Sequence, residues 1–106
     1  MARGRPAASQ IRQNMVDLLY LMKRGHGYEI YQRYIQIFPK VTMRSIYYHL
    51  KKGSQLGEFK VDEIKREQGD YSWGHYAEKV YYSLGPNARP MHRKEVEEAL
   101  RASRSS

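Results

Sequence analysis

The sequence contains no cysteine at any of its 106 positions. Disulfides, thiolate nucleophiles and cysteine zinc sites are therefore excluded, and a chain without disulfides is typical of the cell interior. Long apolar runs are also missing, since the longest covers residues 18–22, against the ~18 residues that span a bilayer. No apolar stretch follows the basic residues 3–5, so we expect no signal peptide and no membrane partner. The expected location is the cytoplasm, in association with the nucleoid.

Acidic residues are absent from two stretches that are rich in basic ones. The chain carries 19 Lys+Arg against 11 Asp+Glu, a net charge of +8, which indicates a polyanionic partner. Residues 1–12 and 41–57 each hold three basic residues and no acid, whereas residues 58–84 are net negative. Acid-free clusters favour a nucleic-acid footprint over an ordinary solvated surface. The partner that we expect is double-stranded DNA.

The sequence offers little for catalysis or for metal binding. Its glycines mark turns and form no phosphate cradle. The acids Asp62, Glu63 and Glu67 have no partner base suited to proton transfer. The four histidines stand at no metal-ligand spacing; they are His26, His49, His75 and His92. We therefore expect a protein that is not an enzyme and that uses no cofactor and no metal.

Apolar periodicity predicts three short helices in the first half of the chain. The first is expected after an N-cap at Ser9, and the second covers about residues 30–38, after which Pro39 stops it. The third begins after the N-cap Thr42 and ends before Gly57. These helices are short, as in small DNA-binding heads.

After the third helix the apolar residues recur at every second position, which predicts the strands of a β-hairpin. Phe59 and Val61 alternate with polar residues, and Ile64 breaks the alternation, which indicates a bulge. Residues 68–75 read as a turn-rich tip, and residues 80–84 alternate again as the second strand. Basic residues near these strands add local charge.

The order helix, helix, helix, strand, strand, helix is the layout of a winged helix-turn-helix, an α+β fold. We expect a flexible basic arm at residues 1–8 and a winged-helix DNA-binding domain at residues 9–85. Residues 86–106 follow as a C-terminal segment whose helix opens at Pro90 and mediates dimerisation. The third helix of this layout enters the major groove, and here it is also the acid-free basic segment.

The outward side of the third helix carries the main candidate DNA contacts. With Ile46 and Leu50 buried, a basic and polar face lies opposite them. Arg44 is the candidate for a bidentate guanine contact, and the lysines suit phosphates. The alternative is an ordinary solvated helix face. The candidates on this helix are Arg44, Ser45, Tyr48, Lys51, Lys52 and Gln55.

The arm and the tip of the wing supply further candidates. Arg3-Gly4-Arg5-Pro6 resembles the core of the AT-hook, in which glycine lies deep in a narrow minor groove while arginines seek its negative potential. The alternative for Arg3 and Arg5 is a basic tail that touches phosphates. Trp73 and His75 at the wing tip suit the minor groove or phosphates, and the alternative for Trp73 is packing back on the domain.

Ten tyrosines are many for this length. Their hydroxyls suit the rim of a small core, and the alternative is a tyrosine-lined pocket for a small-molecule effector, which nothing else indicates. The tyrosines that fall on the predicted buried faces are Tyr28, Tyr31, Tyr34, Tyr47 and Tyr82.

Two apolar stripes favour a homodimer over packing within one chain. The first helix has more apolar residues than it needs to pack against its own chain on one face. The last helix carries only a narrow apolar stripe. A dimer sets two third helices about 34 Å apart and favours a palindromic site. The expected dimerisation residues are Leu18, Leu21, Met22, Val96, Ala99 and Leu100.

Residues 25–85 resemble the PadR-like branch of winged-helix transcriptional regulators. The string His26-Gly27-Tyr28-Glu29-Ile30 matches the opening of that family's second helix, and Tyr81-Tyr82-Ser83-Leu84 matches the end of its last strand. Gly53 departs from it, because the family has an apolar residue there. The layout is also similar to that of replication terminator proteins. The resemblance implies a DNA-binding dimer that pairs through helices outside the reading head.

These observations together predict a sequence-specific double-stranded DNA-binding protein that regulates transcription. The alternative is an architectural or chromosomal protein with little sequence preference, which the small size, the charge and the AT-hook-like arm favour. A protein-interaction winged helix fits the basic third helix poorly, and an RNA binder lacks an exposed aromatic sheet.

Overall fold

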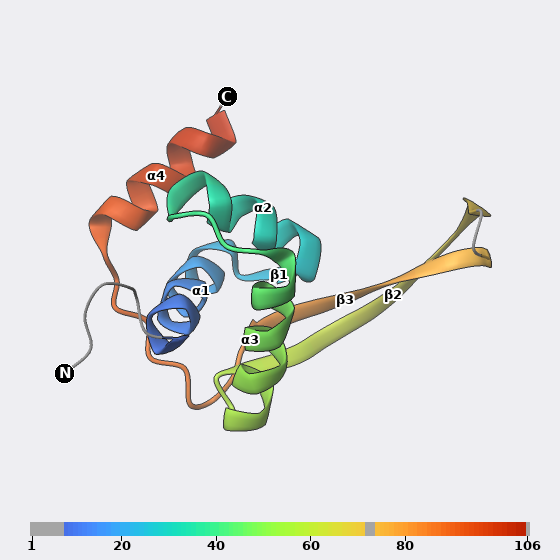
Figure 1. Cartoon of the computed structure of the whole chain (residues 1–106), viewed down its shortest axis with the longest axis horizontal. Coiled ribbons are helices and arrows are strands. Elements are labelled where there is room, and N and C mark those ends of the chain that lie inside the picture. Colours follow the sequence, from blue (N-terminus) through green and yellow to red (C-terminus); the bar gives the residue numbers. More distant parts are fainter. Residues whose placement is uncertain (1–7, 72–73, 106) are drawn as a thin grey trace.

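A computed structural model of the chain describes residues 8–71 and 74–105. Four helices gather into a body, and a long hairpin projects from it (Figure 1). This confirms the α+β winged helix-turn-helix. None of the described helices is long and apolar enough to cross a membrane. In chain order the elements are α1 (Ala8–Met22), β1 (Arg24–His26), α2 (Gly27–Ile37), α3 (Met43–Leu56), β2 (Phe59–Tyr71), β3 (Gly74–Leu84) and α4 (Lys94–Ser105).

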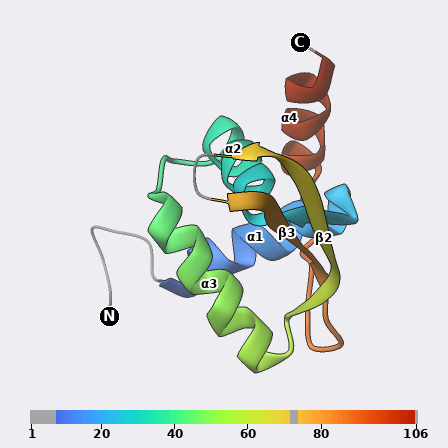
Figure 2. The ribbon, with the colours of Figure 1, turned by 90° about the vertical axis from the view of Figure 1, so that its right-hand side faces the viewer.

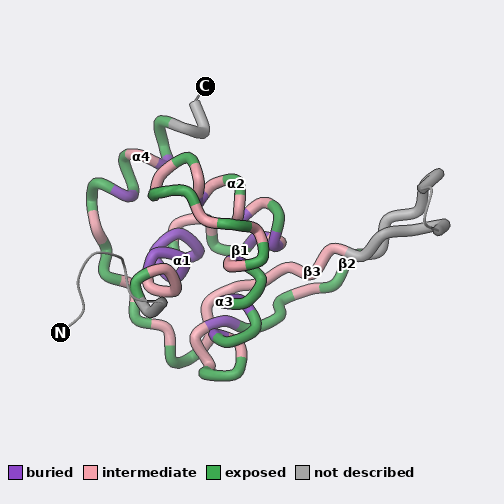
Figure 3. Tube along the Cα trace, in the orientation of Figure 1, coloured by how far each residue is buried: buried purple, intermediate pink, exposed green. Residues whose placement is uncertain are grey.

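Helix α1 forms the centre of the core. Its residues 14–19 are all buried (Figure 3), because α2, α3, α4 and the sheet pack around it. The apolar richness of this helix, which the sequence suggested was for a partner, is therefore largely used inside the chain. The largest fully buried side chains are Tyr34, Phe59, Met15, Leu18, Leu19, Ile30, Ile46, Leu50 and Val16.

Local capping sets the ends of α2 and α3. His26 Nδ1 accepts the backbone N–H of Glu29 at 3.3 Å, and Thr42 Oγ1 accepts that of Ser45 at 3.1 Å. Gly57 follows α3 with a φ of 80°, a left-handed conformation that suits glycine. The predicted N-cap Thr42 and the predicted stop at Gly57 are thus confirmed.

Helix α1 begins at a different residue from the one that the sequence predicts. Ser9 lies inside the helix, which starts at Ala8, so its assignment as N-cap is wrong. The helix ends at Met22, and Lys23, with a φ of 76°, donates its N–H to the carbonyl of Leu19 at 2.8 Å. The chain therefore turns before Gly25, which is free to join a strand.

The sheet has three antiparallel strands in the order β1-β3-β2. The sequence analysis missed β1, because three residues are too few to show an alternation. It also placed a turn-rich loop at residues 68–75, whereas the strands continue to Tyr71 and resume at Gly74. The pairing of β2 with β3 runs from Phe59↔Leu84 out to Tyr71↔Gly74. The register shifts between Val61 and Glu63, so the bulge precedes the predicted position at Ile64.

Gly53 is buried in α3 for a packing reason. A Cβ at this position would lie 2.5 Å from Cε2 of Phe59, so only glycine lets the first ring of β2 rest against the helix. Gly53 thus marks a close contact between helix and strand, and α3 continues past it to Leu56.

A polar network fastens the segment before α4 to α1. Asp17 is 3% exposed, and its carboxylate accepts the backbone N–H of Met91 and Nε of Arg93, both at 2.8 Å. Arg93 also donates to Asn14 Oδ1 at 2.9 Å. Residues 91–93 are therefore held in a non-helical conformation, and α4 starts at Lys94 instead of at Pro90.

The predicted dimerisation residues divide into two groups. Leu18, Val96 and Leu100 are buried in their own chain, so we correct their assignment: they pack in the core of the single chain. The half-buried members of the predicted set are Leu21, Met22 and Ala99.

Candidate nucleic-acid interface

The outward side of α3 is polar and basic along its length. The helix buries Ile46, His49, Leu50 and Gly53 and runs along one side of the body next to the root of the hairpin (Figure 2). Ser45 is half-buried. The exposed residues of this face, called the α3 face below, are Arg44, Tyr47, Tyr48, Lys51, Lys52 and Gln55. The structure thus brings five of the six candidates from this helix together on one exposed face.

Ion pairs neutralise basic residues elsewhere in the molecule. Arg12 contacts Glu58 at 3.1 Å, and Arg24 contacts Asp62 at 3.0 Å and Glu63 at 2.6 Å. Two further pairs join Arg93 to Asp17 and Arg101 to Glu97.

The α3 face has no such neutralisation. Within residues 8–71 and 74–105, none of Arg44, Lys51 and Lys52 forms an ion pair with an acid, and α3 itself contains no acid. A basic residue in a partly buried ion pair stays neutralised by its acid, because salt screens such a pair only weakly. An unpaired cation on the surface instead attracts polyanions at long range. The α3 face therefore presents three cations that no described acid neutralises, on a helix that carries no acid of its own, although exposed cations such as Lys60, Arg89 and Lys94 also lie outside it.

Two tyrosines predicted to lie in the core are exposed. Tyr47 is 46% exposed and Tyr28 is 50% exposed, so their assignment to buried faces is wrong, whereas Tyr34 is buried as predicted. Tyr47 sits at the border of the α3 face because its ring covers Gly27, where a Cβ would lie 2.6 Å from the Tyr47 hydroxyl oxygen. Tyr82 is half-buried, and burial, followed by the nearby Tyr47, raises its pKa.

His49 lies directly behind the α3 face and was not predicted to have a role there. It is 2% exposed, and its Nδ1 has no hydrogen-bond partner among the described residues. Burial lowers the pKa of His49, and Arg12 lowers it further, so both effects favour the neutral ring. It meets the ring of Tyr48 edge-on at 5.0 Å and thereby supports that side chain from below. The sequence does contain a signal for its burial, because His49 lies three residues after Ile46 and four before Gly53, on the buried side of the helix.

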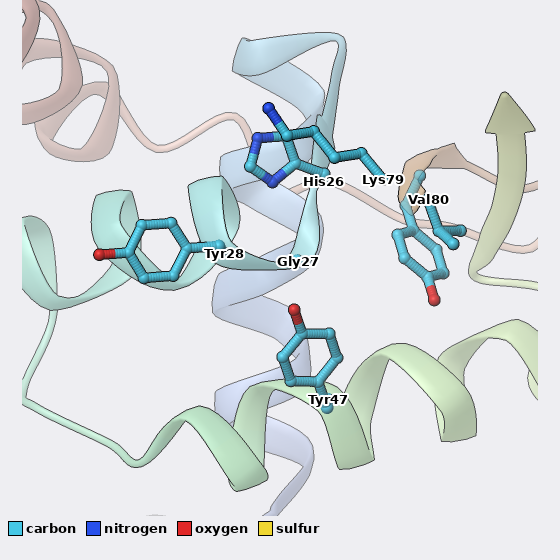
Figure 4. A pocket seen from close by; sticks show the side chains of 7 residues that line it. His26, Gly27, Tyr28, Tyr47, Lys79 and Val80 are labelled. Carbon is cyan, nitrogen blue, oxygen red and sulfur yellow. The ribbon is translucent and has the colours of Figure 1, made fainter. Parts of the chain in front are cut away.

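A cleft of about 590 Å³ opens between the start of α2, the α3 face and strand β3 (Figure 4). In the figure Tyr47 points from α3 toward Gly27, and Tyr28 projects along α2. Among the residues whose side chains the structure describes, none that lines the cleft is acidic; the lining consists of His26, Gly27, Tyr28, Tyr47, Lys79, Val80 and Tyr82. We call this feature the wing cleft. Three of its lining residues, Tyr28, Tyr47 and Tyr82, belong to the tyrosines that the sequence assigned to buried faces.

The remaining candidates are not brought to this face by any described contact. Arg3, Arg5 and Trp73 lie outside the described residues, and His75 is described only as part of the backbone of β3. In the part of the chain that is described, no three His, Cys, Asp or Glu side chains are grouped so that they could hold a metal ion.

The fold of this chain is similar to that of solved structures of other proteins. No protein-family model matches the chain, and no curated protein does. A PadR-family transcription regulator from Clostridium difficile is 18% identical, with a TM-score of 0.43, over 85% of this chain and 83% of its own. A PadR-like transcription factor from Bacteroides fragilis is 16% identical, with a TM-score of 0.41, over 92% of this chain and 84% of its own.

A third solved structure, a transcriptional regulator from Clostridium thermocellum, is 17% identical, with a TM-score of 0.43, over 95% of this chain and 87% of its own. Two of the three are described as PadR-type regulators, the family that residues 25–85 resemble.

Proposed function

We propose that the protein is a sequence-specific double-stranded DNA-binding regulator of transcription that acts as a homodimer. The observation that carries this proposal is the unpaired, acid-free α3 face on a helix of 14 residues. Such a helix fits the width of the major groove, where base edges present distinct patterns of donors and acceptors. The partner is DNA because the exposed charge is positive and the fold presents a helix.

The roles of individual residues follow from their positions on α3. Arg44 lies in the first turn, the part of a recognition helix that reaches base edges, and its guanidinium matches the two acceptors of guanine. Tyr48 and Gln55 add neutral hydrogen-bonding groups to the same face. Lys51 and Lys52 lie further along the helix and suit phosphates, which position the protein without reading sequence.

The wing and the arm would extend the footprint beyond α3. The hairpin leaves the body beside α3 (Figure 1), so its far end, with Trp73 and His75, would reach the neighbouring minor groove or its phosphates. The basic arm with Arg3 and Arg5 would also contact the minor groove or phosphates. A chromosomal protein with little sequence preference would use these same charges, and specificity separates the two functions.

Selection of bound duplexes from a random library at about 0.15 M salt tests the proposal at near-physiological ionic strength. We expect one enriched motif, palindromic for a dimer. Retention of duplexes without enrichment would establish the architectural alternative, and absence of retention would rule out DNA as the partner.

Variants on the enriched duplex then test the α3 face. Arg44→Ala is expected to relax specificity at one position and to weaken binding by about 1–3 kcal/mol. Lys52→Met is expected to weaken binding to all sequences equally and to lower the salt slope by about one. Matched controls are Arg89→Ala and Lys94→Met, which remove exposed cations outside the α3 face. Equal binding by Arg44→Ala and wild type would remove α3 from the reading of bases.

A further inference from the structure

We propose that His49 is an acid-sensitive support of the α3 face, which binds DNA while the imidazole is uncharged and loses its affinity when the ring takes up a proton. This inference rests on the proposed function and deepens it, because it assigns a regulation by pH to the same site. His49 is buried behind the face, so it acts as a positioning residue and not as a contact to DNA.

The side chain of His49 is enclosed by the protein without a full set of hydrogen bonds. It is 2% exposed, and its Nδ1 has no hydrogen-bond partner among the described residues. A neutral imidazole carries one N–H donor, whereas an imidazolium carries two donors and a full charge, all of which need partners when they are buried. The surroundings of His49 therefore fit the neutral ring better than the charged one.

The charge next to His49 has the same sign as a protonated ring. Arg12 approaches from α1, and its positive charge acts on the imidazole. The acid nearest to Arg12 is Glu58, which contacts its Nε at 3.1 Å and is thereby engaged with the guanidinium. A proton on His49 would thus place a second cation beside Arg12 in a poorly solvated space, where like charges repel strongly.

The charged groups on the other elements that pack against α3 are engaged away from His49. Helix α3 also packs against α2 and β2. The charged residues of α2, Glu29 and Arg33, line a recess with Arg24. In β2, Asp62 and Glu63 both contact Arg24. Lys60 and Lys65 of β2 are exposed, as are Arg44, Lys51 and Lys52 of α3 itself.

The ring of His49 is joined to the exposed face through Tyr48. The two rings meet edge-on with their centroids 5.0 Å apart, and Tyr48 is 57% exposed. A charged imidazole would move toward water or push Arg12 aside, and either displacement removes the support of Tyr48 and disturbs the contact between α1 and α3. The α3 face would then no longer keep the arrangement that binds DNA.

The expected effect of acid is opposite to that of charge alone. Acid protonates exposed histidines such as His92, and added positive charge strengthens binding to a polyanion. Binding that weakens in acid therefore requires a group whose charging disrupts the protein. Burial, followed by Arg12, lowers the pKa of His49, so the loss should develop below about pH 6.5, the ordinary value of histidine, as the pH falls through the lowered pKa.

Binding of a labelled mixed-sequence duplex between about pH 7.5 and about pH 5, at constant ionic strength, tests the inference across the range in which histidine titrates. We expect the affinity of wild type to fall several-fold toward the acid end. His49→Phe keeps a ring against Tyr48 but cannot take up a proton, so its affinity is expected to stay level or to rise in acid.

His92→Phe is the matched control. His92 also meets a tyrosine edge-on, with its ring centroid 4.7 Å from that of Tyr20, but it is exposed. This variant is expected to lose affinity in acid as wild type does. Thermal unfolding at about pH 7.5, where histidine is mostly neutral, verifies that each variant is folded.

Two further measurements do not depend on the folding of His49→Phe. NMR of isotopically labelled wild type follows the assigned imidazole signal of His49, which we expect to titrate below about pH 6.5. Arg12→Met removes the cation beside the ring, so it should raise the pKa of His49. Both the NMR titration and the loss of binding are then expected to move to higher pH.

The outcomes distinguish this inference from the proposed function. A wild-type affinity that rises steadily toward acid would overturn the inference and leave DNA binding intact. An equal acid loss in His49→Phe and wild type, or an unmoved pH profile in Arg12→Met, would also overturn it, because the effect would then come from another group. A wild-type protein that binds no duplex at any pH refutes both the inference and the proposed function.

Discussion

Single residues on α3 show why a helical period alone does not locate a surface. Ile46 and Leu50 are buried as the spacing predicts, yet Tyr47 is exposed and Gly53 is buried. The period identifies the direction of the core, whereas the neighbouring elements decide how far the buried arc extends. Gly53 is covered by Phe59 from a strand that follows later, and that partner cannot be read from the helix.

Gly53→Ala separates helix propensity from packing. Propensity alone predicts that alanine stabilises the helix by up to about 1 kcal/mol. The close approach of Phe59 predicts the opposite, a loss of about 1–3 kcal/mol in the free energy of unfolding, because the added methyl group overpacks the core.

Urea denaturation followed by circular dichroism measures the difference. The control is the same substitution in a Phe59→Leu background, where the smaller side chain should reduce the penalty of alanine. A Gly53→Ala protein more stable than wild type would show that Phe59 can move away without cost.

At the scale of elements, the sequence predicts the four helices and the hairpin, and it fails where structure depends on partners distant in the chain. The caps at Thr42 and Gly57 are local signals and are confirmed. Strand β1 exists only because β3 pairs with it, and the late start of α4 depends on Asp17, more than seventy residues earlier. The same holds for the wing cleft, whose lining comes from three segments of the chain.

The contact between Arg93 and Asp17 is expected to control how firmly α4 is held. Arg93→Met leaves the carboxylate of Asp17 buried without its cation, and removing one partner of a buried pair costs about 3–5 kcal/mol. Arg101→Met breaks an exposed pair on α4 instead, and an exposed helical pair contributes only about 0.3–0.5 kcal/mol.

Chemical denaturation of both variants provides the measurement. A loss in Arg93→Met no larger than that in Arg101→Met would show that hydrogen bonds from Met91 and Gln13 suffice to stabilise Asp17.

At the scale of the whole molecule, a second copy is expected to bind at the half-buried apolar residues of α1 and α4. These residues are Leu21, Met22 and Ala99. Leu21 lines a recess with Glu97, Leu100 and Arg101. We expect wild type to sediment as a dimer and Leu21→Glu to sediment as a monomer with an unchanged circular dichroism spectrum, because a charge there would be buried in the interface.

Met91→Glu is the matched control, since Met91 is exposed and lies outside that recess. Analytical ultracentrifugation of the three proteins distinguishes the states. A monomeric wild type would refute the dimer, and a dimeric Leu21→Glu would place the interface elsewhere.

The ion pairs at the root of the hairpin also have a mechanical consequence. Beyond the bulge at Asp62, β2 continues to Tyr71, a projection of about 30 Å at ~3.3 Å per residue. A rotation of about 10° at the root would carry the end of this strand by roughly 5 Å, more than the ~3.4 Å between successive base pairs. Arg24 contacts both Asp62 and Glu63 at the bulge, so in the proposed complex with DNA a rotation about this contact would change which base step the far end of the wing meets.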